Sequence, residues 1–222
     1  MIVLALEGAL GGFSAALARD GKIVASRALE GNVALEAGLG AVQEVMASVG
    51  VTHANLDRIA VGVGPGGFTG LRITITYAKA LAQAWNLPLV AISSFDILEF
   101  GRALPAALTV VVGRTGIISA RFRDEAGERR ASGPIEQTLR AVLPPPGRLD
   151  VVGAPEDVLA CLAEGGYTVN PLVPLVTPPA AALALAAAGA RPAASLHEVR
   201  ADYGEAPAAK VPTFRETQRE KR

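Results

Sequence analysis

A glycine-rich segment, GPGGFTGLR, occupies residues 64–72 between a short apolar run and a helical pattern. Glycine allows positive φ angles and close backbone approach, and amides at the start of a helix can hold an anion. Arg72 could pair with a phosphate or a carboxylate. Two interpretations stay open: a tight turn whose glycines serve close packing, or an anion- or nucleotide-binding loop of Gly64, Pro65, Gly66, Gly67, Phe68, Thr69, Gly70 and Arg72. No Gly-Lys-Ser/Thr follows, so the segment is not a Walker A motif.

The remaining reactive residue types are sparse. Glu7 ends the first apolar run, and we favour a strand-ending carboxylate in a turn over a contact to metal-bound phosphate. His53 and His197 are far apart and Cys161 stands alone, so no zinc-type spacing occurs. Ser93-Ser94 lies outside any Gly-x-Ser-x-Gly and is typical of a helix cap. We therefore predict no catalytic residue, no metal and no cofactor.

Composition narrows the class of protein. The chain has 222 residues, 50% hydrophobic and 19% charged, which excludes global disorder. Lys plus Arg and Asp plus Glu both number 21, so the basic excess typical of strong polyanion binding is missing and any nucleic-acid role should depend on a partner. One cysteine permits no internal disulfide and favours the cytoplasm. The longest apolar stretch, residues 180–190, is too short to span a bilayer, so no membrane association is expected.

The elements that must position these residues follow the same order twice. Apolar runs and turn signals predict three strands at residues 2–6, 13–17 and 23–26, then a helix, a strand, a helix and a strand at 34–49, 59–63, 71–85 and 89–92. A short helix follows to about residue 102. The second series has strands at 107–112, 117–123 and 129–131, a helix at 135–143, a strand at 149–152, a helix at 155–164, a strand at 168–169 and a helix at 179–188.

Two βββαβα halves predict an α/β protein of the actin-like ATPase (ASKHA, RNase H-like) fold, by analogy of architecture alone. The expected divisions are an N-terminal subdomain at residues 1–104, a C-terminal subdomain at 105–190 and a tail at 191–222. We expect the tail to pack partly on the first half and its charged end to fray.

Two helices of the first half have more apolar residues than one buried face needs. The first has Leu35, Leu39, Val42 and Met46 at helical spacing, and the second has Ile73, Tyr77 and Leu81. Such helices can pack on their own sheet and on another chain, or be buried between the two halves. The residues alone leave both interpretations open.

The segment IAVGVGPGGFTGLRI at residues 59–73, followed by AKALA at 78–82, closely resembles the bacterial TsaB (YeaZ) family. The family motif is Gly-Pro-Gly-Ser-Phe-Thr-Gly-Leu-Arg with Ala-Lys-Gly-Leu-Ala, so Gly67 and Ala80 depart from it. The strand and Ser-Ser turn at residues 88–94 also resemble the family. The resemblance covers residues 1–98 and is architectural beyond them.

The resemblance implies a noncatalytic scaffold subunit of the machinery that makes N6-threonylcarbamoyladenosine (t6A) in tRNA. Such a subunit binds and activates a TsaD-type catalytic subunit, joined by a TsaE-type ATPase, and dimerises when alone. The same helical face serves both contacts, which places the partner interface at Leu35, Leu39, Val42, Met46, Ile73, Tyr77 and Leu81. tRNA is contacted only through the complex.

Several departures from the family weaken any claim of nucleotide binding. Asp-Thr-Ser is usual after the first strand, where this chain has Glu7-Gly8-Ala9, and the usual His-Ser before the first helix is replaced by Asn32-Val33. The alternative that we retain is a nucleotide-binding ATPase or phosphotransferase of the actin-like fold. A glycoprotease-like activity is disfavoured because the metal histidines are missing.

Overall fold

The computed structural model describes residues 1–30 and 36–204. The first half contains β1 (Ile2–Glu7), β2 (Phe13–Arg19), β3 (Lys22–Leu29), α1 (Gly38–Ser48), β4 (Arg58–Gly62), α2 (Phe68–Trp85), β5 (Leu89–Ile92) and α3 (Ser94–Glu99). Its five strands lie in the order β3-β2-β1-β4-β5. β1 pairs antiparallel with β2 and parallel with β4, so the first strand is central and its end faces the glycine-rich turn after β4.

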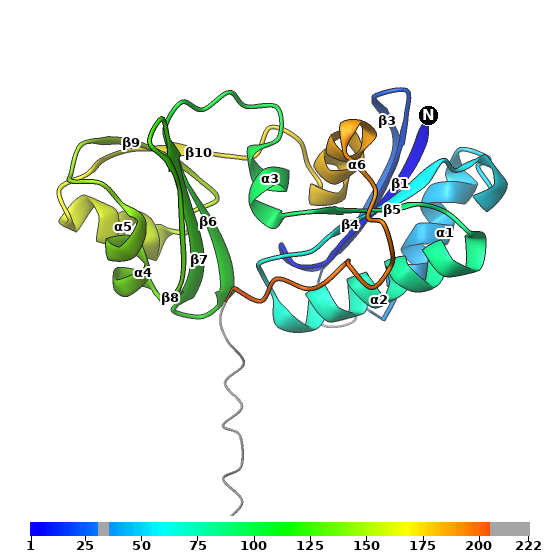
Figure 1. The fold of residues 1–222 in the computed structure, drawn as a ribbon, viewed down its shortest axis with the longest axis horizontal. Coiled ribbons are helices and arrows are strands. Elements are labelled where there is room, and N and C mark those ends of the chain that lie inside the picture. Colours follow the sequence, from blue (N-terminus) through cyan, green and yellow to red (C-terminus); the bar gives the residue numbers. More distant parts are fainter. Residues whose placement is uncertain (31–35, 205–222) are drawn as a thin grey trace, which may run out of the picture.

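The second half repeats this arrangement. It contains β6 (Ala107–Arg114), β7 (Ile117–Asp124), β8 (Gly127–Pro134), α4 (Ile135–Val142), β9 (Arg148–Val152), α5 (Glu156–Glu164) and β10 (Thr168–Leu172), and the chain then continues into α6 (Pro179–Gly189). Its five strands lie in the order β10-β9-β6-β7-β8. Read from the other edge, β8-β7-β6-β9-β10 repeats the order of the first sheet, with β6 in the place of β1. Figure 1 shows the two sheets side by side, each with helices against it. The predicted α/β, actin-like architecture with two similar halves is confirmed.

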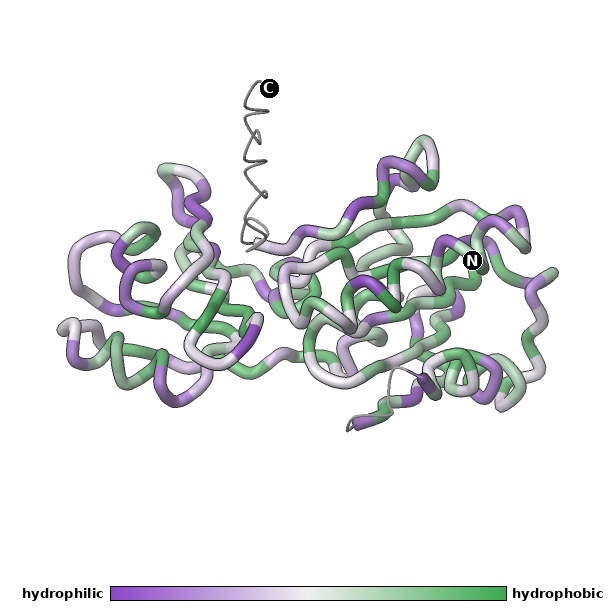
Figure 2. Tube along the Cα trace, turned by 90° about the horizontal axis from the view of Figure 1, so that it is seen from below, coloured by the Kyte–Doolittle hydropathy of each residue, from purple (hydrophilic) through white to green (hydrophobic). Residues whose placement is uncertain are grey.

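Alternation along β1 explains how the first sheet holds two apolar layers. Leu4 and Leu6 belong to the core beneath α1 and α2, whereas Val3 and Ala5 belong to the core beneath α6. Successive strand residues point to opposite faces, so a continuous apolar run suits a strand covered on both sides. Figure 2 shows hydrophobic residues (green) concentrated in the strands and hydrophilic ones (purple) at outer turns.

The chain returns to the first half after completing the second. α6 packs on β1 and β2, and five of its alanines, at positions 180, 181, 182, 184 and 187, are buried there, which lets its backbone approach the sheet closely. The segment after α6 stays on the first half: the Ala193 amide donates to the Leu89 carbonyl at 2.9 Å, and Val199 joins the core under α2. The domain bounds predicted from the sequence stay predictions. The helix that precedes the predicted boundary at residue 190 is α6, and it packs on the sheet of the first half.

Two helix bounds differ from those expected. α2 begins at Phe68, so Phe68, Thr69 and Gly70 form its first turn instead of a loop. α1 begins at Gly38 within the described residues, and Leu35 of the predicted interface lies outside them. The Ser93 cap is confirmed, because its hydroxyl accepts a hydrogen bond from the Phe95 amide at 3.2 Å. Within residues 1–30 and 36–204, no helix combines the length and apolarity needed to cross a membrane.

Candidate functional site

The glycines after β4 stand where two backbone segments come into close contact. Gly64 has φ +94°, and a Cβ there would lie 2.3 Å from the Asp202 carbonyl oxygen. A Cβ on Gly66 would lie 2.3 Å from the carbonyl oxygen of Ala9, and the Gly67 amide donates to that same oxygen at 2.8 Å. Any side chain would collide with backbone at both positions. Packing thus accounts for Gly64 and Gly66.

The motif residues that follow are displayed on the first turns of α2. Phe68 is 56% exposed, and the guanidinium carbon of Arg72 lies 5.2 Å from its ring centroid. Thr69 is exposed, whereas Gly70 is buried, with its carbonyl oxygen 3.1 Å from where a Cβ on Gly8 would be. The buried part of the motif therefore shapes the turn, and the side chains of Phe68, Thr69 and Arg72 are exposed at the surface.

Glu7 lies buried at the end of the central strand of the first sheet. Its Oε1 accepts hydrogen bonds from the amides of Ala9 at 2.7 Å and Leu10 at 3.2 Å. Burial raises the pKa of this carboxyl to about 7, against the opposing effect of the backbone amides that hydrogen-bond to it. This carboxyl exchanges a proton near neutral pH, a property that strand patterning could not indicate. Among the described residues, no group of three His, Cys, Asp or Glu side chains is placed to hold a metal ion.

The residues predicted to bind a partner are distributed between the surface and the core. Leu39 is 39% exposed, whereas Val42 and Met46 are buried in the core of the first half. Ile73, Tyr77 and Leu81 are half-buried along α2.

An apolar groove of about 530 Å³ lies between α1 and α2. Leu39, Val42 and Met46 line it from α1, and Leu81 and Trp85 line it from α2. Ile73 and Tyr77 lie outside it and line a separate depression with Phe68 and Arg72. The structure thus brings four of the predicted interface residues into one groove and adds Trp85, which stacks on His53 with centroids 5.8 Å apart.

An ion cluster joins the two halves and was not predicted from the sequence. Arg121 on β7 is only 1% exposed, with one terminal nitrogen 2.6 Å from Asp96 Oδ1 and the other 2.9 Å from Glu99 Oε1, both carboxylates being on α3. Glu128 on β8 is 3.9 Å away, and the guanidinium also lies over the Phe95 ring, 5.0 Å from its centroid. A buried cation among carboxylates is costly to break, so this cluster fixes α3 against the second sheet.

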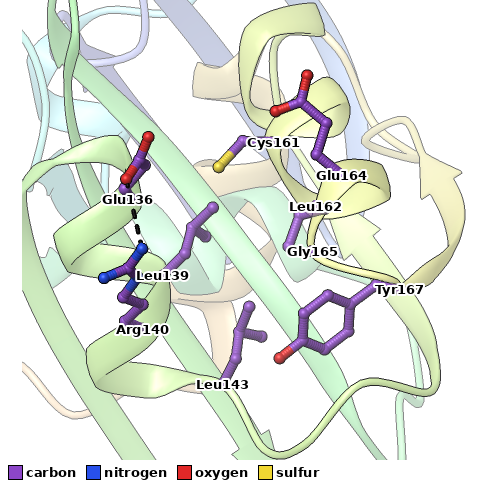
Figure 3. Close-up of a pocket in the computed structure, with 9 residues that line it drawn as sticks. All are labelled: Glu136, Leu139, Arg140, Leu143, Cys161, Leu162, Glu164, Gly165 and Tyr167. Carbon is purple, nitrogen blue, oxygen red and sulfur yellow. Dashed lines mark ion pairs between the residues drawn. The ribbon is translucent and has the colours of Figure 1, made fainter.

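A further cavity of about 280 Å³ lies between α4 and α5 in the second half (Figure 3). Leu139, Leu143 and Leu162 form its apolar wall, and Cys161 and Tyr167 line it as well. The Tyr167 hydroxyl donates to the Pro144 carbonyl at 2.5 Å. Burial, followed by Glu136 and Glu164, raises the pKa of the Cys161 thiol. Cys161 thus lies half-buried at the edge of a cavity.

Comparison with known proteins places these features in a family. A family model described as TsaD: tRNA N6-adenosine threonylcarbamoyltransferase matches residues 35–152, just over half of the chain. The tRNA threonylcarbamoyladenosine biosynthesis protein TsaB of Escherichia coli is 34% identical over 101 residues, 46% of this chain and 44% of that protein. A tRNA N6-adenosine threonylcarbamoyltransferase of Geotalea uraniireducens is 29% identical over 198 residues, 71% of this chain and 57% of that protein.

Solved structures extend the likeness of fold to about nine-tenths of the chain. YeaZ from Pseudomonas aeruginosa superposes with a TM-score of 0.65 at 23% identity, covering 91% of this chain and 99% of that one. A second structure, of an uncharacterized protein with similarity to peptidase YEAZ from Pseudomonas aeruginosa, superposes with a TM-score of 0.68 at 21% identity, covering 92% of this chain and 99% of that one. At these identities the likeness shows the fold alone.

The paired sheets and their shared strand order define a protein of the actin-like ATPase fold. The matched region spans about half the length of the first curated relatives. With the family model covering more than half of its residues, the chain belongs to the TsaD family. The resemblance to TsaB (YeaZ) proteins that the glycine-rich motif indicated is confirmed.

Proposed function

We propose that this chain is a noncatalytic scaffold subunit of a cytoplasmic complex that makes t6A in tRNA. In this role it binds and activates a TsaD-type catalytic subunit. The observation that carries the proposal is the groove between α1 and α2, where Leu39 is 39% exposed beside Trp85 and Leu81 on a surface of apolar side chains. Exposed apolar patches of this kind mark sites where proteins associate.

The partner surface consists of Leu39, Leu81 and Trp85 at the groove, continued along α2 by Ile73 and Tyr77. Val42 and Met46 form the floor beneath them and hold the helices on the sheet. A stable interface buries at least about 1,000 Å² with an apolar centre, more than this groove alone supplies. The rest of the contact therefore comes from the outer faces of α1 and α2.

The placement predicts different outcomes for two leucines. Leu39→Glu puts a charge into the proposed interface, where burial without a partner is unfavourable, yet the exposed position leaves folding almost unchanged. Leu175→Glu alters a leucine that is 56% exposed and precedes α6, away from both helices, and serves as the matched control. Co-purification with TsaD should be lost for Leu39→Glu and kept for Leu175→Glu. Retention by both variants would refute this interface.

When alone, the same face joins two copies of the chain, and in the complex a TsaE-type ATPase and tRNA complete the assembly. Reconstitution of tRNA modification from purified components, with and without this chain, tests the function itself. We expect t6A to form at an appreciable rate only when the chain is present. Equal rates without it would remove the scaffold role.

The alternative, a nucleotide-binding ATPase or phosphotransferase, has one observation in its favour: the buried Glu7 carboxyl at the end of the central strand. Titration calorimetry with ATP and magnesium distinguishes the two functions. The alternative requires tight binding that Glu7→Ala abolishes. The scaffold proposal expects no heat of binding at millimolar nucleotide.

A further inference from the structure

A second groove runs along the other side of α2, between this helix and the segment that follows α6. It has a volume of about 410 Å³ and is lined by Arg72, Ile75, Thr76, Lys79, Val199, Arg200, Ala201 and Tyr203. Three of these residues are cationic and none is acidic. Glu198 and Asp202 flank it in the sequence without lining it, and each accepts a backbone hydrogen bond, from the amides of Ala194 and Gly204 respectively. The groove therefore presents positive charge on a chain whose net charge is zero.

Two aromatic rings stand at one end of this groove. The Phe68 and Tyr203 rings lie 5.0 Å apart between centroids with a tilt of 35°, and they are 56% and 39% exposed. Arg72 approaches the Phe68 ring, so cation and aromatics form one continuous surface. Exposed rings beside a positive groove are the combination by which proteins hold single-stranded nucleic acid, the rings stacking on bases and the cations contacting phosphates.

We propose that this groove, with Arg72, Lys79 and Arg200 along it and Tyr203 at its end, binds a single-stranded segment of RNA. The choice of RNA rests on the proposed function, and the groove itself on the residues above. An acidic peptide would satisfy the cations but would make no use of the two exposed aromatic side chains. The cations of the site therefore contact phosphates and its aromatic ring stacks on a base, so binding does not depend on the base sequence.

The positive groove and the apolar groove between α1 and α2 share no lining residue, although the α2 part of the proposed partner surface, Ile73 and Tyr77, adjoins the positive groove at Arg72. Arg72, Thr76 and Lys79 follow one another at spacings of four and three and face residues 199–203. Leu81 and Trp85 face α1 instead. A partner seated on Leu39, Leu81 and Trp85 therefore leaves Lys79, Arg200 and Tyr203 available to RNA.

Fluorescence anisotropy of the full chain with an unstructured RNA oligonucleotide tests the inference. With three cations engaged, log K should fall with log salt at a slope of roughly −2, because each phosphate contact on a single strand contributes about 0.7. The double variant Lys79→Gln/Arg200→Gln should bring the slope to about −0.7. Arg191→Gln, an exposed arginine earlier in the same segment and outside the groove, should leave it unchanged.

The aromatic contribution has its own control. Tyr203→Ala should weaken binding about fivefold or more, the loss expected for one stacked base, whereas Tyr203→Phe should retain it. Circular dichroism shows whether each variant is folded, and the changes at the half-buried Lys79 and the exposed Arg200 keep the test available if Tyr203→Ala is not. We expect fully paired RNA and poly-glutamate to compete poorly.

Unchanged binding in the double variant would overturn the inference, as would equal binding to duplex RNA. Strong competition by poly-glutamate would assign the groove to an acidic peptide and also overturn it. The experiments distinguish an error in this RNA-binding groove from an error in the proposed scaffold function. A chain that stimulates t6A formation without binding RNA refutes only the groove, and a chain that binds RNA without stimulating modification refutes only the scaffold role.

Discussion

The buried carboxyl of Glu7 makes the stability of this protein depend on pH across neutrality. Its pKa is 4.5 in an unfolded chain and about 7 in the folded protein, mainly because burial disfavours the charged form. Between these values the folded state binds the proton more tightly. The stability from this group is therefore fully present below pH 4.5 and is lost as pH rises through 7. Linkage gives a loss of about 2.5 kcal/mol between pH 5 and pH 8.

Glu7→Gln isolates this contribution. The amide keeps an oxygen to accept from the Ala9 and Leu10 amides but does not titrate over this range. Urea unfolding followed by Trp85 fluorescence reports on the half that contains Glu7, at pH 5 and at pH 8. We expect the wild-type free energy of unfolding to fall by about 2.5 kcal/mol more than that of Glu7→Gln. Glu44→Gln, which changes an exposed carboxyl on α1, should behave like the wild type.

Equal pH dependence in the wild type and Glu7→Gln would refute this reasoning. It would mean that the folded carboxyl titrates near its ordinary pKa, because water or a cation reaches it. A steeper fall in Glu7→Gln would reverse the sign and would be equally decisive. The comparison between variants removes the contributions of every other titrating group, since these are common to both proteins.

Three further predictions concern the turn, the ion cluster and the cavity. Gly64→Ala should lower the free energy of unfolding in urea by more than about 2 kcal/mol, because its Cβ meets the Asp202 backbone. The control is Gly116→Ala: Gly116 also has positive φ, but no atom lies within 4 Å of its Cβ position, so only the conformational cost of about 1–2 kcal/mol is expected. Arg121→Met should destabilise the protein by about 1–3 kcal/mol in urea unfolding, and by more than a surface arginine change does, because the largely buried Glu99 then keeps only Arg123, at 3.5 Å, as a cation. Cys161 should alkylate more slowly than free cysteine at pH 8, as followed by mass spectrometry, because its thiol pKa is raised; an equal rate would contradict this.

Local patterning was sufficient for the elements and their repeated order. The apolar run at the start of the chain predicts a buried strand, and β1 is central with both faces covered. The helix pattern that ends at Trp85 is also confirmed at its C-terminal end. The start of that helix was misplaced, because glycines and a threonine have weak helix propensity. The contact that holds its N-cap, from the Gly67 amide to the Ala9 carbonyl, joins residues far apart in the sequence.

The sequence also determined the family, since the motif at residues 64–72 is specific enough to be recognised alone. The sequence could not show which apolar residues on one face of a helix are exposed and which are buried. Leu39 and Met46 share the apolar pattern of α1, yet only Leu39 has substantial exposure. Which residues of a stripe remain at the surface depends on how far the helix sinks between its neighbours, and those neighbours come from distant parts of the chain.

Tertiary structure alone decided the remaining features of the candidate sites. Gly64 needs to be glycine because Asp202, 138 positions later, crosses it. Arg121 is a buried cation because two carboxylates from α3 meet it across the junction of the halves. The positive groove exists because the segment after α6 returns to lie along α2. Periodicity reports only on neighbours within an element, whereas each of these contacts joins residues brought together by the path of the whole chain.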